Sequence, residues 1–192
     1  SGAKKTAALF SDKIREHHLD VPVGVTGCLG LCYLETIVDV YEDDGTLTRY
    51  TKVSPDHVEN IFTSHILNKT PCQASVIPSS GQAFLDKQTR VALKNCGVIN
   101  PEEISDYIKA GGYAALTKAL TEMTSQEICD TISDAGLRGR GGGGFPTGRK
   151  WQQVRKQEEP VKYVVCNADE GDPGAFMDRS IMEGDPHKML EG

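Results

Sequence analysis

The sequence predicts an α/β fold built from two successive units. Amphipathic segments with helical spacing alternate along the 192 residues with short runs of β-branched residues. Aromatic residues make up only 6% of the chain, so the cores must be built mainly from aliphatic side chains. Prolines, serines and glycines gather in one stretch near the middle, which is typical of a linker. We therefore predict a first unit over residues 1–70, a linker over 71–98 and a second unit over 99–192.

The first unit is predicted from apolar spacing and from turn and cap residues. Ala7, Phe10 and Ile14 fall on one face of a helix, and Glu42-Asp43-Asp44-Gly45 predicts the turn of a hairpin. Ser54 followed by Pro55 is typical of a helix start. The expected elements are a helix over 3–17, a strand over 21–26, a tight loop over 27–32, strands over 36–41 and 46–53, and a helix from 54 that buries Val58, Ile61, Phe62 and Ile66.

The second unit is predicted to be mainly helical, with one strand late in the chain. Asn100 as N-cap with Glu103 at N3 predicts one helix start, and the capping box of Thr124 and Glu127 predicts another. Gly136 suits the C′ position that ends the second of these helices. The expected elements are a helix from 100 that stops at Gly111-Gly112, a short helix over 113–121, a helix from 124 to 135, and a buried strand over 161–166.

Charge and cysteine content exclude several classes of protein. A net charge of −6 argues against nucleic acid or an anionic membrane as the main partner. The sequence has no run of eighteen apolar residues and no apolar signal core, so we expect no direct membrane insertion. Six cysteines are spread along the chain without an export signal, which favours cytoplasmic thiols or metal ligands over disulfides. We therefore expect a cytoplasmic protein.

The most informative stretch is the glycine-rich segment 136–150. It holds seven of the 20 glycines and four cations, Arg138, Arg140, Arg149 and Lys150, but no acid. Glycine allows positive φ and close approach of backbone N–H groups, which together form a positively polarised nest for phosphate or an electron-rich ring. The segment matches no Walker-type phosphate loop, and its Gly-x-Gly-x-x-Gly match follows a predicted helix rather than a strand. We interpret it as an anion cradle for a cofactor; a structural turn and an RGG-type nucleic-acid segment are the alternatives.

A polar cluster follows the predicted strand 161–166. It contains Asn167, Asp169, Glu170 and Asp172. In open α/β sheets, ligands bind beyond the carboxyl ends of strands. Amide and carboxylate oxygens there could accept hydrogen bonds from ribose, carboxamide or ring N–H groups of a nucleotide cofactor. A solvated turn and an oxygen-ligand metal site are the alternatives, and the spacing lacks the EF-hand pattern.

The loop 27–32 presents two thiols, Cys28 and Cys32, with three residues between them. This spacing could place two thiolates on one iron, although a [2Fe–2S] cluster needs four ligands. The spacing differs from the Cys-x-x-Cys of a thioredoxin redox centre. The other four cysteines do not pair at ligand spacing. Two buried thiols are the alternative interpretation of Cys28 and Cys32.

Two motifs carry a resemblance to a known family. The run Gly-Leu-Arg-Gly-Arg-Gly-Gly-Gly-Gly-Phe-Pro-Thr-Gly-Arg-Lys-Trp at 136–151 resembles the NADH-oxidising flavoprotein subunit of respiratory complex I. The same subunit recurs in NAD-reducing and electron-bifurcating hydrogenases and in NAD-dependent formate dehydrogenases. Lys-Tyr-Val-Val-Cys-Asn-Ala-Asp-Glu at 162–170 resembles the second motif of that family, and the similarity covers about residues 85–192. Thr-Gly-Cys-Leu-Gly-Leu-Cys at 26–32 resembles a thioredoxin-like [2Fe–2S] ferredoxin domain.

The resemblance implies a fold, cofactors, partners and site residues. The first unit would be a thioredoxin-like ferredoxin-type domain, and residues 99–192 the N-terminal part of an α/β FMN- and NADH-binding domain. Hydride transfer would need no catalytic side chain, and the partners would be other iron–sulfur subunits of a redox complex. Cys28 and Cys32 would ligate a [2Fe–2S] cluster. The residues implied for FMN and NAD(H) are Gly139, Arg140, Gly141, Gly142, Gly144, Phe145, Lys150, Asn167, Asp169, Glu170 and Asp172.

Several positions depart from the family pattern. Gly143 stands where Ala is usual, Asp172 where Glu is common, and Gln153 where an aromatic residue often occurs. The first cysteine pair of the ferredoxin domain and the later FMN, NADH and [4Fe–4S] segments of the flavoprotein lie outside this sequence. We therefore expect a fragment trimmed at both ends, in which the cluster is incomplete. The alternative function is a cofactor-free piece with a structural or interaction role only.

Overall fold

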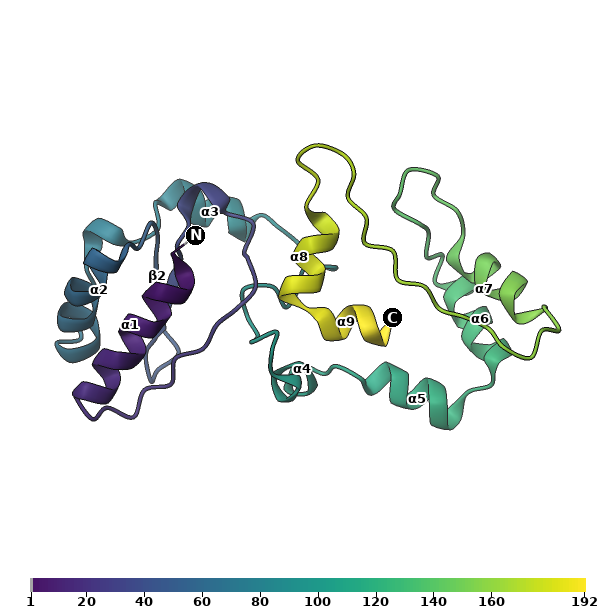
Figure 1. Ribbon diagram of the computed structural model, residues 1–192, viewed down its shortest axis with the longest axis horizontal. Coiled ribbons are helices and arrows are strands. Elements are labelled where there is room, and N and C mark those ends of the chain that lie inside the picture. The colour runs from purple at the N-terminus through teal and green to yellow at the C-terminus, as the bar shows by residue number, and fades with distance from the viewer. Residues whose placement is uncertain (1) are drawn as a thin grey trace.

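The computed structural model describes residues 2–192 and has two parts (Figure 1). The first part packs two helices beside a small hairpin, and the second is an open arrangement of short helices. The elements of the first part are α1 (Ala3–Glu16), β1 (Val38–Tyr41), β2 (Leu47–Tyr50), α2 (Pro55–Ile61) and α3 (Ser79–Asp86). Those of the second are α4 (Ile104–Lys109), α5 (Ala114–Glu122), α6 (Ser125–Asp134), α7 (Thr147–Arg155), α8 (Met177–Gly184) and α9 (Pro186–Glu191).

The predicted hairpin is confirmed. Strands β1 and β2 pair antiparallel, with Asp39 opposite Arg49. The Arg49 guanidinium donates two hydrogen bonds to the Asp39 carboxylate, at 2.8 and 2.6 Å. A partly buried bidentate pair of this kind fixes the register of two short strands. At the turn, Gly45 adopts φ +85°, a conformation that glycine adopts without strain.

The main core lies between α1, α2 and the hairpin. Helix α1 contributes Phe10, and the turn that follows α2 contributes Phe62. Val58, Ile61 and Phe62 are buried as the sequence predicted, and Ile66 is packed against them. Helix α2 begins with Pro55 after Ser54 and then continues as a π-helical turn, Phe62–Leu67.

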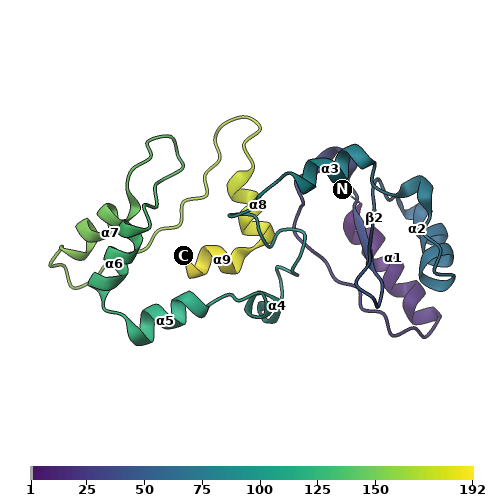
Figure 2. The same cartoon turned by 180° about the vertical axis from the view of Figure 1, so that it is seen from behind.

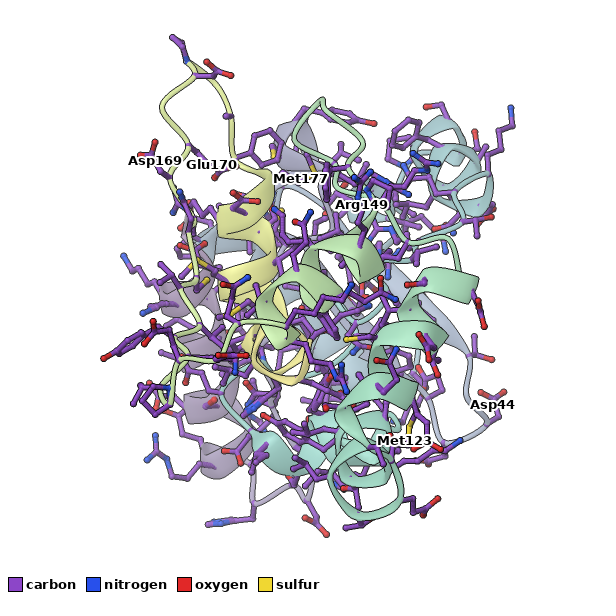
Figure 3. All side chains as sticks on the ribbon, turned by 90° about the vertical axis from the view of Figure 1, so that its right-hand side faces the viewer. Asp44, Met123, Arg149, Asp169, Glu170 and Met177 are labelled. Carbon is purple, nitrogen blue, oxygen red and sulfur yellow. The ribbon has the colours of Figure 1, made fainter. Side chains whose placement is uncertain are left out.

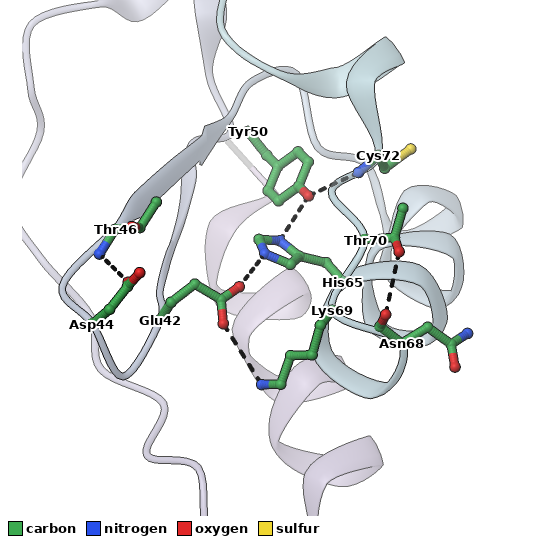
Figure 4. A network of polar contacts seen from close by, with 9 residues as sticks. All are labelled: Glu42, Asp44, Thr46, Tyr50, His65, Asn68, Lys69, Thr70 and Cys72. Atoms are coloured by element: carbon green, nitrogen blue, oxygen red, sulfur yellow. Dashed lines mark hydrogen bonds and ion pairs between the residues drawn. The ribbon is translucent and has the colours of Figure 1, made fainter.

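A buried polar network sits inside this core (Figure 4). His65 is 1% exposed, and both of its ring nitrogens have partners. Nδ1 lies 2.8 Å from the Tyr50 hydroxyl, and Nε2 lies 2.5 Å from the Glu42 carboxylate. The Tyr50 oxygen also accepts a 3.0 Å hydrogen bond from the Cys72 backbone N–H. The network joins β2, the hairpin turn, the π-helical turn and the segment that follows it. Because these polar groups pair with one another, none of the Tyr50 and His65 groups named here lacks a partner in the core.

The helix starts in the second part follow local capping rules in one case and depart from them in another. The Thr124–Glu127 capping box is present in the structure, and Gly136 adopts φ +66° immediately beyond α6, as predicted. The prediction of Asn100 as N-cap is wrong. Helix α4 begins only at Ile104 with Glu103 as its N-cap, because the Asn100 side chain accepts from the Glu102 N–H in a turn that precedes the helix.

Both isolated strands predicted from apolar runs are wrong. Residues 21–26 and 161–166 form no secondary structure, and the hairpin is the only sheet among residues 2–192. Val164 is fully exposed and Tyr163 is 84% exposed. A β-branched run becomes a strand only where a neighbouring strand takes up its backbone groups. The fold is therefore a mixture of helices with one small sheet, and segment 71–98 contains α3, with Gly81 buried against Leu34 and Ile77.

Candidate functional site

The glycine-rich loop joins two helices that pack closely. Helix α6 leads into it and α7 leaves it, so the loop closes a helical hairpin (Figure 1). Gly148, in the first turn of α7, lies against α6, where a Cβ at this position would come within 2.7 Å of the Ser133 nitrogen. Glycine at 148 therefore allows the two helix backbones to approach, and this approach fixes the base of the loop.

Backbone hydrogen bonds close the neck of the loop and leave its tip free. The Gly139 N–H donates to the Phe145 carbonyl and the Thr147 N–H to the Leu137 carbonyl, both at 2.9 Å. Gly142 and Gly144 adopt φ +100° and +58°. Within residues 2–192, no group accepts from the backbone N–H groups of residues 140–144. The tip thus presents a series of unused donors, which is the arrangement that binds anions.

Three arginines contact the loop or its flanks, and Lys150 follows in α7. The Arg138 guanidinium donates to the Gly144 carbonyl at 3.1 Å, which holds it across the loop. Arg140 folds back onto the Arg138 carbonyl at 2.6 Å, and Arg149 lies over the Phe145 ring at 5.8 Å. In the part of the chain that the structure describes, Arg138, Arg140, Arg149 and Lys150 form no ion pair. Their charge is therefore available to an anionic ligand.

The acidic segment is organised by its own backbone and by α8. The Asn167 side chain accepts from the Asp169 N–H at 2.8 Å, and the Asp172 carbonyl accepts from Ala175 at 3.0 Å. The Glu170 carboxylate accepts from the backbone N–H groups of Asp178 at 2.9 Å and Arg179 at 3.1 Å. Glu170 therefore caps the N-terminus of α8, where a negative charge is favoured.

The two segments lie on the same side of the molecule without touching. Figures 1 and 2 show the glycine-rich loop and the loop before α8 projecting in one direction. Figure 3 shows Asp169 and Glu170 on the irregular segment before α8, and Arg149 on α7. No hydrogen bond or ion pair joins residues 136–150 to residues 167–174 within the described chain. The structure thus groups the predicted residues in two sets and leaves the sets separate.

The cap formed by Glu170 was not predicted from the sequence. A capping box is recognised because its two residues are three apart, whereas Glu170 lies eight and nine residues before its partners. Glu191 plays a similar part at α5. Its carboxylate accepts from the Tyr113 N–H at 2.9 Å and the Leu116 N–H at 3.3 Å, in the first turn of that helix. Neither contact has a local sequence pattern that could have revealed it.

The thiol loop holds Cys28 and Cys32 near each other and exposed. The Gly30 N–H donates to the Cys28 sulfur at 3.2 Å, and this sulfur lies 3.7 Å from the Glu35 carboxylate. Although the residue is exposed, partial desolvation of its sulfur raises the pKa of the Cys28 thiol, and the Gly30 hydrogen bond opposes this shift. Among residues 2–192, no set of three Cys, His, Asp or Glu side chains has the geometry of a metal site. The residues present therefore do not fit a complete [2Fe–2S] cluster.

Comparison with known proteins bears on the second part of the chain. Residues 132–192 match the model of the Nuo51 FMN-binding domain. The resemblance to the flavoprotein subunit is confirmed. All eleven residues expected to bind FMN or NAD(H) lie within the segment that matches this domain.

The relatives of this chain are named as subunits of two kinds of enzyme. The chain is 56% identical over 105 residues to the NADP-reducing hydrogenase subunit HndC of Solidesulfovibrio fructosivorans, covering 55% of this chain and 21% of that protein. It is 53% identical over 102 residues to the F 2 subunit of NADH-quinone oxidoreductase from Rhizobium meliloti, covering 53% and 24%. It is 45% identical over 93 residues to the F subunit of NADH-quinone oxidoreductase from Escherichia coli, covering 48% and 21%. The chain thus spans about a fifth to a quarter of these relatives' lengths.

The Nuo51 match stops short of the first part of the structure. The matched segment begins at residue 132, in α6, and ends at residue 192, so the hairpin and the thiol loop lie outside it. No helix among residues 2–192 is both long enough and apolar enough to cross a membrane.

Proposed function

We propose that this chain is part of an NAD(H)-dependent flavin oxidoreductase subunit that exchanges electrons between a nicotinamide nucleotide, FMN and iron–sulfur partner subunits. The observation that carries the proposal is the glycine-rich loop. Its free N–H groups and unpaired cations lie within the segment that matches an FMN-binding domain. Two of the relatives are named as an NADH-quinone oxidoreductase and an NADP-reducing hydrogenase subunit, so the proposal covers the reaction type and not the choice of nucleotide.

The donor set of the loop fits an FMN-type ligand. The N–H groups around Gly141, Gly142 and Gly144 supply neutral donors, and Arg140 supplies a positive charge beside them. Gly139 is fixed by its hydrogen bond to Phe145, so it sets the width of the loop neck rather than contributing a free N–H. Phe145 is 42% exposed, and the Arg149 guanidinium lies over its ring. The exposed part of the ring offers an apolar surface on which a ligand ring could stack.

The remaining proposed residues act on the ring and the nucleotide. FMN, when bound, supplies the hydride acceptor and releases electrons singly. Lys150 would place a positive charge that favours a reduced, anionic ring. Asn167, Asp169 and Asp172 would accept hydrogen bonds from ligand N–H and O–H groups. Glu170 already accepts two backbone hydrogen bonds, so its main role would be to hold the acidic loop in place.

For the first part of the chain, we propose a thioredoxin-like ferredoxin-type unit in which Cys28 and Cys32 are two of the ligands of a [2Fe–2S] cluster. The support is the pair of neighbouring thiols on one tight loop, one of which accepts a backbone N–H. Two thiols cannot complete the cluster, so no electron-transfer step is assigned to these residues.

FMN titration of the full 192-residue chain tests the flavin proposal. Quenching of flavin fluorescence on binding gives the affinity, and Lys150→Gln should weaken it about tenfold through the loss of one charged contact. Lys156→Gln, which removes another exposed cation at the end of α7, is the matched control and should leave the affinity unchanged. Absence of quenching by the unaltered chain would contradict independent FMN binding by these residues.

A cofactor-free structural piece is the second candidate function. The observation in its favour is that no hydrogen bond or ion pair joins the cationic and acidic segments among the described residues. The apolar side chains between them also remain exposed, namely Val161, Tyr163, Val164 and Val165. The same titration separates the two candidates, because a structural piece neither quenches flavin fluorescence nor responds to Lys150→Gln.

A further inference from the structure

A cation anchors the thiol loop from a distant part of the chain. The Arg90 guanidinium donates through Nη2 to the Leu29 carbonyl, 61 residues away in sequence. The N–H that follows this carbonyl in the chain is that of Gly30, and it donates to the Cys28 sulfur at 3.2 Å. The Leu29 carbonyl and the Gly30 N–H belong to one peptide unit. Arg90 therefore holds one end of the same planar group whose other end contacts the sulfur.

Arg90 is itself held in place by two further acceptors. Its Nε donates to the Gln88 side chain at 3.2 Å, and its Nη1 donates to the Cys96 carbonyl at 3.4 Å. The planar guanidinium thus bridges the thiol loop and segment 88–96 with its donors already oriented. A lysine at this position could reach one carbonyl, but a single ammonium lacks the fork that spans both.

The loop also packs on later parts of the chain, through the Leu29 side chain and the Gly27 backbone. Leu29 lies against Gly97, which adopts φ +80°, and Gly27 lies against Gly184 at the end of α8. A Cβ at Gly184 would lie 2.7 Å from the Cys96 sulfur, so this side of the junction has no room for a side chain. These packing contacts involve Gly27 and the Leu29 side chain rather than the Leu29–Gly30 peptide group.

Glycine makes that peptide free to rotate. Gly30 adopts φ +82°, and a glycine tolerates the opposite sign of φ equally well. A half-turn of the Leu29–Gly30 peptide would move its N–H away from Cys28 and its carbonyl away from Arg90. The two hydrogen bonds at the ends of this peptide favour the observed orientation.

We propose that Arg90 is a positioning residue that fixes the Leu29–Gly30 peptide so that its N–H contacts the Cys28 sulfur. This role goes beyond the proposed flavin site. It also holds whether or not Cys28 and Cys32 bind a metal, because every contact involved is present in the protein alone. Segment 88–97, predicted from sequence as part of a linker, thereby supplies the residue that organises the thiol loop.

Amide NMR of the full chain under reducing conditions tests this role at a single pH. In Arg90→Met, the Gly30 amide proton should shift upfield and its hydrogen exchange should accelerate about tenfold, as expected on loss of one charge-assisted hydrogen bond. The amides of Tyr50 and Ile61 in the main core should not change, which separates repositioning of one peptide from general loosening. Arg15→Met removes an exposed cation on α1 and is the matched control.

A conservative variant makes the result decisive. Arg90→Lys should restore part of the Gly30 shift, because an ammonium can still donate to the Leu29 carbonyl. If Arg90→Met does not fold, an intermediate Gly30 signal in Arg90→Lys supports the proposal, and an unchanged one contradicts it. A Gly30 resonance and exchange rate unaffected by both variants would overturn the proposal. FMN titration is independent of these signals, so failure of the flavin proposal would not be confused with failure of this one.

Discussion

The Tyr107 hydroxyl donates a 2.5 Å hydrogen bond to Glu191, 84 residues later in the sequence. Tyr107 on α4 is 4% exposed and stacks on His187 of α9, with ring centroids 5.5 Å apart. The same Glu191 carboxylate caps the first turn of α5. One carboxylate thus ties three short helices together, in a part of the molecule with few buried aliphatic side chains.

Replacing Glu191 by Gln should destabilise the folded chain by about 1–2 kcal/mol at pH 7, because charged hydrogen bonds to one hydroxyl and two N–H groups are weakened. The hydrogen bond from Tyr107 lowers the pKa of Glu191 below its ordinary value. A lowered folded-state pKa gives stability that is present above the unfolded value of about 4.3 and is lost as the pH falls through the folded value. The difference between wild type and Glu191→Gln in urea unfolding should therefore shrink in acid. Glu122→Gln, on the exposed side of α5, is the control; a pH-independent difference would contradict the assignment.

Replacing Glu170 by Ala should uncap α8. The N–H groups of Asp178 and Arg179 lose their acceptor, which typically costs about 1 kcal/mol. Hydrogen exchange of these two amides should accelerate, while the amides of α2 remain protected. Glu183→Ala breaks an exposed ion pair with Arg179 in the same helix and should change stability far less. Equal effects of the two variants would argue against the cap.

Replacing Gly148 by Ala should force α6 and α7 apart. The new methyl group would overlap Ser133 in α6, and overpacking of this kind costs about 1–3 kcal/mol. Gly143→Ala is the matched control, because a Cβ there meets nothing within 4 Å and the residue does not need positive φ. Thermal unfolding should show a lower Tm for Gly148→Ala only. If both variants unfold alike, the close helix approach is not what this glycine provides.

Replacing Tyr50 by Phe should destabilise the folded protein, because the hydroxyl lies at the centre of the buried network. The Cys72 N–H and the His65 Nδ1 each lose their partner, and unsatisfied buried groups cost about 1–3 kcal/mol. Tyr41 is 64% exposed, so Tyr41→Phe tests removal of a hydroxyl without burial. In chemical unfolding monitored by circular dichroism, Tyr50→Phe should lower the free energy of unfolding, whereas Tyr41→Phe should leave it nearly unchanged. A Tyr50→Phe protein as stable as the wild type would mean that water replaces the hydroxyl.

Local patterns predicted local structure well. The hairpin turn at Gly45, the capping box of Thr124 and Glu127, and the helix end at Gly136 each depend on residues within a few positions of one another. These are the cases in which backbone conformation and side-chain acceptors act over one turn. The α1 face containing Phe10 followed from spacing alone, for the same reason.

Features that depend on distant partners were not predictable. The run 161–166 has strand composition but no partner strand among the described residues, so its composition alone could not make it a strand. The Asn100 side chain accepts a hydrogen bond from the Glu102 N–H in the turn before α4, so it does not cap the helix. The contacts of Glu170, Glu191 and Arg90 link positions that no sequence period relates. The glycine-rich loop was recognisable because its function depends on a continuous run, whereas the separation between it and the acidic segment depends on the whole fold.

Residues 158–166 form an irregular, exposed segment, so we expect a protease to cleave this segment first. No backbone group in this range forms a hydrogen bond within the described chain, and Val164 and Tyr163 stand clear of neighbouring side chains. Proteases bind substrates as extended, accessible backbone, so trypsin should cleave after Lys162 before it cleaves within the helices. One cut there would divide the molecule between the α6–α7 hairpin and the α8–α9 pair, and any ligand that binds both would reveal itself by protecting that single bond.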